Sequence, residues 1–289
     1  MKLQEPVAPH GDLASTTQAS RQWFPYAAQL LAAIISFIEK TFTIVGLEAS
    51  KLRHDPTDLF MRAIQPALWL LIFGEVFTHI RAIPTGGERY LDFMAPGILA
   101  QSVLFIAIFS GIAVIWERDL GIIHKFLASP TPRAALVLGK ALAAAVRGLA
   151  QAVIIYVLAL MLDVHMNWHP LALLGVVIMV ILGAACFSTF SLVIACLVKT
   201  RERFMGIGQV LTMPLFFASN AIYPVAIMPS WLQAIAHSNP LSYEVDALRA
   251  LMLAGGTSTT GLVSDFVVML VATIALVLVG AQLYPRVVR

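Results

Sequence analysis

The residues best suited to chemistry in this chain are a carboxylate and two imidazoles, Asp163, His165 and His169, which stand close together in a polar stretch. These are common zinc ligands, but three such residues on one short flexible segment also occur by chance. We therefore expect a solvated loop here and no metal site.

No motif of a hydrolytic enzyme is present in the sequence. A phosphate-binding loop ends in Gly-Lys-Ser/Thr after an upstream glycine, whereas the only Gly-Lys pair, Gly139-Lys140, is followed by Ala141. The zinc-protease motif His-Glu-x-x-His and the nucleophile motif Gly-x-Ser-x-Gly are both missing. We expect neither catalytic residues nor a bound cofactor in this chain.

Four polar side chains inside apolar stretches are the remaining candidates for function: Glu75, Gln101, Arg147 and Asn220. A charge at the centre of a bilayer costs about 2.5 kcal/mol or more, so each charged group needs a cause. Glu75 lies near one membrane surface, and Arg147 can extend to the other surface or pair within the bundle. We favour structural roles over substrate contact for both, and interhelical hydrogen bonds for the two amides.

Long apolar stretches must position these residues. The chain is 59% hydrophobic and 12% charged, and a helix of about 20 residues crosses a hydrocarbon core of about 30 Å. The sequence therefore predicts an all-α membrane protein whose residues 58–285 form six transmembrane helices. These begin near Leu59, Phe93, Leu136, Leu171, Phe204 and Leu262.

The positive charges indicate the orientation of these helices. Only Arg81, Arg89 and Arg249 fall on one side, and nearly all other Lys and Arg residues fall on the opposite side. Basic residues favour the cytoplasmic face, so we expect both termini, including the tail 286–289, in the cytoplasm. The net charge of +3 reflects this topology and does not indicate a nucleic-acid partner.

Two segments precede the first apolar stretch. Residues 1–22 are polar and of mixed charge, which predicts disorder. For residues 23–57 we favour a helix on the inner membrane surface, in contact with lipid, and the alternative is a seventh crossing at 23–38.

The inner loop after the second stretch carries an amphipathic pattern. Leu120, Ile123, Phe126 and Leu127 can share one face of a short helix that ends at a Pro-x-Pro sequence. This face could lie on lipid headgroups or contact a cytoplasmic partner.

The segment between the fifth and sixth stretches is too apolar for a solvated loop and too rich in proline for a clean span. We expect two short helices at the outer leaflet, packed on the bundle and capped by Ser230 and Ser242. Asp246 and Arg249 are spaced i, i+3, which predicts a modest surface salt bridge.

Several short motifs together resemble the permeases of type-2 ABC exporters, over roughly residues 40–285. The nearest group is that of daunorubicin-resistance and nodulation-factor exporters. The resemblance depends on the order and spacing of these motifs. The motifs are Glu117-Arg118-x-x-Gly121, Ser129-Pro130-x-x-Arg133, Gly139-Lys140, Met228-Pro229-x-Trp231 and Asn239-Pro240-x-x-Tyr243-x-Val245-Asp246-Ala247-Leu248-Arg249.

The resemblance implies a mechanism and partners. Two permease copies, a homodimer in preference to a heterodimer, would bind two cytoplasmic ATPase subunits that hold ATP and Mg²⁺, in a prokaryotic inner membrane. The substrate would be an amphipathic drug, lipid or glycolipid. The alternatives are a polysaccharide or O-antigen exporter and, from another class, a secondary transporter. By the same resemblance, the ATPase-coupling residues are Glu117, Leu120, Gly121, Ile123, Phe126 and Leu127, and the outer re-entrant segment contains Pro229, Trp231, Asn239, Pro240, Asp246 and Arg249.

Overall fold

The computed structural model describes residues 57–80, 83, 89–121 and 133–284, and the single positions 39, 43, 46 and 50. The helices described below all belong to the unit Lys40–Arg289. The predictions for residues 1–22, for most of 23–57, for Ile123, Phe126 and Leu127, and for the tail 286–289 lie outside the described residues.

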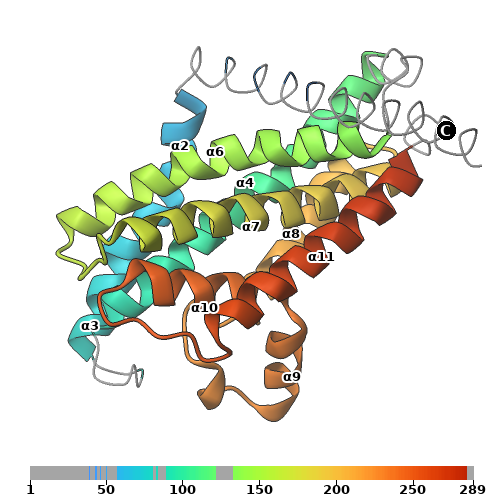
Figure 1. Ribbon diagram of the computed structural model, residues 1–289. Coiled ribbons are helices and arrows are strands. Elements are labelled where there is room, and N and C mark those ends of the chain that lie inside the picture. Colours follow the sequence, from blue (N-terminus) through green and yellow to red (C-terminus); the bar gives the residue numbers. More distant parts are fainter. Residues whose placement is uncertain are drawn as a thin grey trace, which may run out of the picture. The chain divides into compact units, whose positions relative to one another are not determined.

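The described part of the chain is helical, which confirms the all-α prediction. Its single β-type contact is an isolated bridge between Met166 and Leu253. Figure 1 shows the elements in chain order: α2 (Thr57–Leu68), the π-helix η1 (Trp69–Gly74), α3 (Glu75–Ile80), α4 (Tyr90–Asp119), α6 (Arg133–Met161), α7 (Pro170–Leu197), α8 (Arg201–Phe217), the 3₁₀-helix η2 (Val225–Ile227), α9 (Ser230–Ser238), α10 (Pro240–Met252) and α11 (Leu262–Leu283).

Five helical stretches within the described residues are long and apolar enough to cross a membrane. They match five of the six expected spans and are Ala63–Ile80, Tyr90–Asp119, Leu136–Met161, Pro170–Leu197 and Leu262–Leu283. The remaining expected span corresponds to α8, which has 17 residues. The six-span topology therefore stays a prediction.

Local sequence explains where α8 and α10 begin. Thr200 precedes α8, and its side chain accepts a hydrogen bond from the backbone N–H of Arg203. Asn239 caps α10 by accepting from the N–H of Leu241, and Pro240 follows at the first helical position, where no N–H is needed. The expected caps were wrong: Ser230 is the first residue of α9, and Ser242 is buried within α10.

The first span differs from a regular helix because Trp69–Gly74 is wound as a π-helix. Pro66 lies in the preceding turn and lacks the N–H that an α-helix would use. A π-helical turn inside a longer helix is rare, and it often marks a functional position. The apolar pattern alone did not indicate it.

The core of the described bundle is built around α4, which is buried along most of its length. This helix packs against α6, α7, α8 and α10. At Gly97 an added methyl group would overlap the backbone of Ala221, so this position requires glycine. Cys186 and Cys196 are both buried and free, as expected from their spacing.

Helix α10 lies antiparallel to α7. Leu251 faces Gly175, and Glu244 faces Gly183, eight residues further along α7. Gly183 is thirteen residues from the start of α7, so Glu244 lies about 20 Å along that helix. We call the end of the bundle with residues 163–169 the outer end, and the end with Asp119 the inner end. Helix α10 thus extends from the outer end to about the middle of α7.

Candidate functional site

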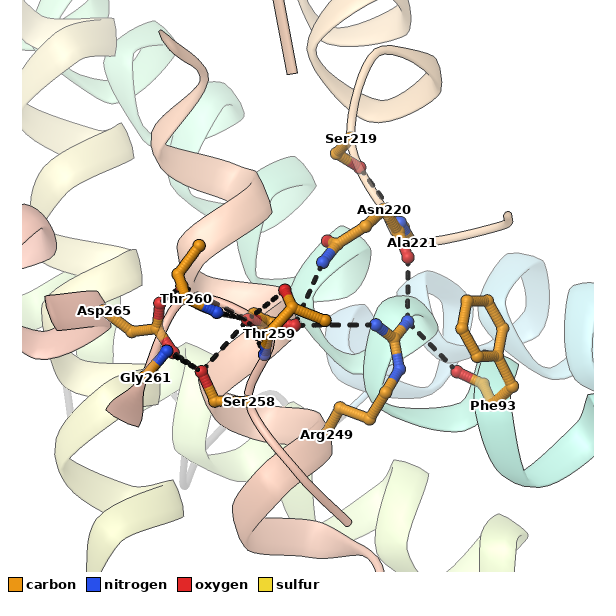
Figure 2. Close-up of polar contacts among 11 residues, drawn as sticks. Phe93, Ser219, Asn220, Ala221, Arg249, Ser258, Thr259, Thr260, Gly261 and Asp265 are labelled. Atoms are coloured by element: carbon orange, nitrogen blue, oxygen red, sulfur yellow. Dashed lines mark hydrogen bonds and ion pairs between the residues drawn. The ribbon is translucent and has the colours of Figure 1, made fainter. Parts of the chain in front are cut away.

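Arg249 is the centre of a buried polar cluster at the outer end (Figure 2). One of its terminal nitrogens donates to the carbonyl oxygens of Asn220, at 2.8 Å, and Phe93, at 3.4 Å. The guanidinium carbon lies 3.9 Å from the centre of the Phe93 ring, and the other terminal nitrogen is 4.0 Å from Asp246 Oδ1. The predicted i, i+3 pair is therefore present, but Asp246 is 2% and Arg249 8% exposed, so the prediction that it lies at the surface was wrong. Helix α10 turns this face into the bundle.

Asp246 holds the segment that leads into α11. Its Oδ2 accepts hydrogen bonds from the backbone N–H groups of Thr259, at 2.7 Å, and Thr260, at 3.1 Å. It also accepts from the hydroxyls of Ser258, Thr259 and Thr260. The Ser258 and Thr260 hydroxyls also lie within hydrogen-bond distance of Asp265. Because a hydroxyl has one hydrogen, each donates to one of the two carboxylates at a time. The Asp246 carboxylate is therefore an acceptor that fixes residues 258–260 against α10.

Asn239 extends these contacts to the end of α8. Its Nδ2 donates to the carbonyl oxygens of Leu215, at 2.7 Å, and Ala218, at 3.1 Å, while Asn220 Nδ2 donates to Asp246 Oδ1 at 3.4 Å. We call Asn220, Asn239, Asp246, Arg249, Ser258, Thr259, Thr260 and Asp265 the outer cluster. It ties α4, α8, α10 and α11 together.

The outer cluster contains four residues that the sequence singled out: Asn220, Asn239, Asp246 and Arg249. Pro229 and Trp231 do not join them. They flank the start of α9, where Trp231 is 64% exposed. Because Asp246 and Asp265 are engaged by the backbone and hydroxyl donors of residues 258–260, this arrangement clamps chain segments together.

A histidine contact at the outer end was not expected. The Nδ1 of His165 lies 3.1 Å from Asp92 Oδ2 of α4, so this ring contacts the bundle. Among the described residues, no group of three or more His, Cys, Asp or Glu is placed to hold a metal.

A second set of charged contacts joins helix ends at the inner end. Arg118 donates to the carbonyl oxygens of Val198, at 3.2 Å, and Lys199, at 2.6 Å, in the short connection between α7 and α8. Asp119 accepts from Arg201, the first residue of α8, at 2.9 Å. The Arg201 guanidinium lies 3.9 Å from the centre of the Trp116 ring. The inner end of α4 is thus attached to the start of α8.

Glu117 adds a link to α6. It forms an ion pair with Lys140, and both side chains are about four-fifths buried. We call Trp116, Glu117, Arg118, Asp119, Lys140 and Arg201 the inner network. Of the other predicted coupling residues, Leu120 is 67% exposed and Gly121 has φ of +70°, a left-handed conformation that ends α4 there.

The predicted polar residues within the spans do not gather in one place. Glu75 and Arg147 are partly buried on α3 and α6. Gln101 is 3% exposed, and its Oε1 has no hydrogen-bond partner among the described residues. It borders a cavity of about 110 Å³ between α2 and α4, with Gln65, Pro66, Phe105 and Phe109.

Sequence reasoning missed Trp116, Asp119 and Arg201 as partners, and it missed Glu244, which is fully buried. The signal for Arg201 was available. Only five residues, Lys199–Arg203, separate the apolar stretches of α7 and α8, so α8 had to begin close to the inner end of α7. No pattern signalled Glu244, because its surroundings come from other helices.

Comparisons with known proteins identify the family. Residues 39–253 match the family model described as ABC-2 type transporter. The chain is 29% identical to a putative transport permease, ycf38, of Cyanophora paradoxa over 74% of each chain. It is 27% identical to a daunorubicin resistance ABC transporter permease protein, DrrB1, of Streptomyces coeruleorubidus over 84% of this chain and 85% of that one. It is 25% identical to the inner membrane transport permease YadH of Escherichia coli over 77% and 85%. The chain therefore belongs to the ABC-2 type transporter family and is a membrane permease of an ABC transporter.

Proposed function

We propose that this permease exports an amphipathic drug, lipid or glycolipid across a prokaryotic inner membrane, powered by a separate ATPase. Two copies pair, each spans the membrane six times with both termini in the cytoplasm, and each binds one ATPase subunit that holds ATP and Mg²⁺. The similarity to a daunorubicin resistance permease supports the amphipathic substrate class.

The inner network is the observation that carries this proposal. Residues 122–132 join the inner ends of α4 and α6, and Arg118, Asp119 and Glu117 fasten these ends to Val198, Lys199, Arg201 and Lys140. A force applied by an ATPase on 122–132 would therefore reach α4, α6 and α8 together. Rigid helices joined by charged contacts are a physical route for such coupling.

Exposed apolar faces support the pairing of two copies. Helices α2 and η1 expose Met61, Ile64, Leu68 and Ile72, and α8 exposes Val210 among others. In a bilayer such faces contact lipid or another helix. In the proposed dimer, α2, α4 and α8 border the substrate pathway, and the cavity next to Gln101 lies beside it.

The two alternative functions are a polysaccharide exporter and a secondary transporter, and each predicts a different substrate or partner. A polysaccharide or O-antigen exporter would share the architecture and differ in substrate. A secondary transporter would need no ATPase and is expected to contain repeats with broken helices near the membrane midplane.

Purification of the permease together with the soluble ATPase encoded nearest to it tests the proposal. We expect a complex of two permeases and two ATPases whose vanadate-sensitive ATP turnover drives export of a fluorescent amphipathic drug from proteoliposomes. A permease that binds no ATPase would favour the secondary transporter. A complex that moves oligosaccharide and no amphipathic compound would favour the polysaccharide exporter.

Reversal of one charge in the inner network should uncouple transport from ATP turnover. The Asp119–Arg201 pair is partly exposed and its charges are screened by water, so Asp119→Arg should leave thermal stability nearly unchanged. Transport per ATP hydrolysed should fall several-fold, because the ion pair between Asp119 of α4 and Arg201 of α8 is replaced by a repulsion between two arginines. The double variant Asp119→Arg with Arg201→Asp should recover much of the loss. Equal transport per ATP in the single variant and the wild type would contradict this role.

A further inference from the structure

Glu244 is a carboxyl group enclosed within the bundle without a partner. Its side chain, on α10, is 0% exposed. None of the described residues forms a hydrogen bond with either carboxyl oxygen. Buried charges in proteins are normally paired and hydrogen-bonded, because an isolated ionised carboxylate is strongly destabilised away from water.

The Glu244 carboxyl is enclosed against helix α7, far from either end of the bundle. The carboxyl lies against Gly183 of α7, where even one added methyl group would overlap it. Because Gly183 is about halfway along α7, water at either end of the bundle is about 20 Å away along that helix. Glycine at this position leaves the space that the Glu244 carboxyl occupies between α10 and α7.

Charged and titratable groups on the neighbouring elements do not neutralise Glu244. On α7 the group that interacts with it electrostatically is the thiol of Cys186, which is uncharged and supplies no positive charge to Glu244. On α11 Asp265 is bonded by Ser258 and Thr260, and on α4 Asp92 contacts His165. On α10 itself, Asp246 and Arg249 are engaged in the outer cluster.

We propose that Glu244 is a proton-binding site in the middle of the bundle, and that α10 packs against α7 only while the proton is bound. Ionisation breaks the O–H bond of the carboxyl and transfers the proton to water, which requires α10 to separate from Gly183. Burial raises the pKa of Glu244 well above its ordinary value of 4.5, in agreement with a neutral acid in the packed state. This inference does not depend on the direction or substrate of transport.

The sign of the pH dependence follows from this linkage. A carboxyl whose pKa is raised by folding stabilises the folded state fully below pH 4.5, its unfolded value. The stabilisation is lost as pH rises from 4.5 toward the pKa of Glu244 in the folded protein. Between these two pKa values, the equilibrium constant for unfolding increases by up to about tenfold per pH unit, because one proton is released on unfolding.

Thermal unfolding of the purified full chain in detergent, measured between pH 5 and pH 8, tests the site. Glu244→Gln cannot ionise, so its melting temperature should exceed that of the wild type at pH 8, and the excess should shrink toward pH 5. Glu244→Leu, which is apolar and of similar size, should behave in the same way if the glutamine variant does not fold. The control is Glu202→Gln on the exposed side of α8, whose difference from the wild type should not change with pH.

Two results would overturn the proposal. The first is a wild type more stable than both Glu244 variants at pH 8, because that would show an ionised carboxylate with a favourable partner. The second comes from hydrogen–deuterium exchange, with wild type and Glu244→Leu compared at the same pH. We expect the α10 amides of the wild type to exchange faster than those of the variant at pH 8 and equally at pH 5. Equal exchange in the wild type and the variant at both pH values would show that the packing of α10 does not depend on protonation of Glu244.

Discussion

Replacing Asp246 by alanine should lower the free energy of unfolding by about 3–5 kcal/mol, the range for removal of one partner from a buried charge network. The change would leave the N–H groups of Thr259 and Thr260 without their acceptor and Arg249 without its nearby carboxylate. Unpaired buried donors each add a desolvation cost. The measurement is chemical or thermal unfolding of the purified permease in detergent, monitored as the loss of the helical circular dichroism signal.

Two variants show whether this loss comes from the outer cluster. Asp246→Asn keeps one carbonyl acceptor for the 258–260 segment and should cost less than the alanine variant. Glu202→Ala removes an exposed carboxylate from α8 and should change stability by no more than about 0.5 kcal/mol. If Asp246→Ala were as stable as Glu202→Ala, the outer cluster would contribute nothing to the fold.

The double variant Ile123→Asp with Phe126→Asp should separate the permease from its ATPase. If each apolar side chain fills a pocket on the partner, truncation costs about 2 kcal/mol or more per residue. Both changes together would weaken association by about a thousandfold. Co-purification of the ATPase and ATP-driven transport should then fall to background, while the permease remains in the membrane at its usual level.

A matched control places one negative charge in the same segment. His124→Asp lies between the two positions and away from the expected apolar face, so it should reduce association far less. Retention of the ATPase by the double variant at wild-type affinity would remove the coupling role of residues 120–127 and leave lipid contact as their function.

Much of the fold could be predicted because the length and position of each apolar stretch indicate directly where a membrane-crossing helix lies. Five of the six expected spans are helices of membrane-crossing length, and the outer connections fall at the expected places, after Ile80 and Met161. Asn239-Pro240 starts α10 for a local reason that can be read from the chain, although we expected serine caps. The π-turn of η1 could not be predicted, since it depends on how the strain at Pro66 is relieved within the packed helix.

The sequence predicted which residues belong to the candidate site, but it did not predict that they are buried and hydrogen-bonded to one another. Asn220, Asp246 and Arg249 were singled out, but their spacing suited an exposed helix face equally well. Which face of α10 is buried depends on α4, α7 and α11, which are distant in sequence. The same limitation concealed Glu244, whose neighbour Gly183 is 61 positions away.

The wide turn in the first span has a mechanical consequence. A helix with one extra residue in a single turn can pass that extra residue to the next turn, and each such step rotates one side chain by about 100° about the axis. The ends of the helix keep their heights in the membrane while this happens. Trp69 and Phe73, whose rings are stacked at 4.4 Å within η1, are the side chains that such a step would turn. The first span can thus change the surface that it presents to its surroundings without sliding along its own axis.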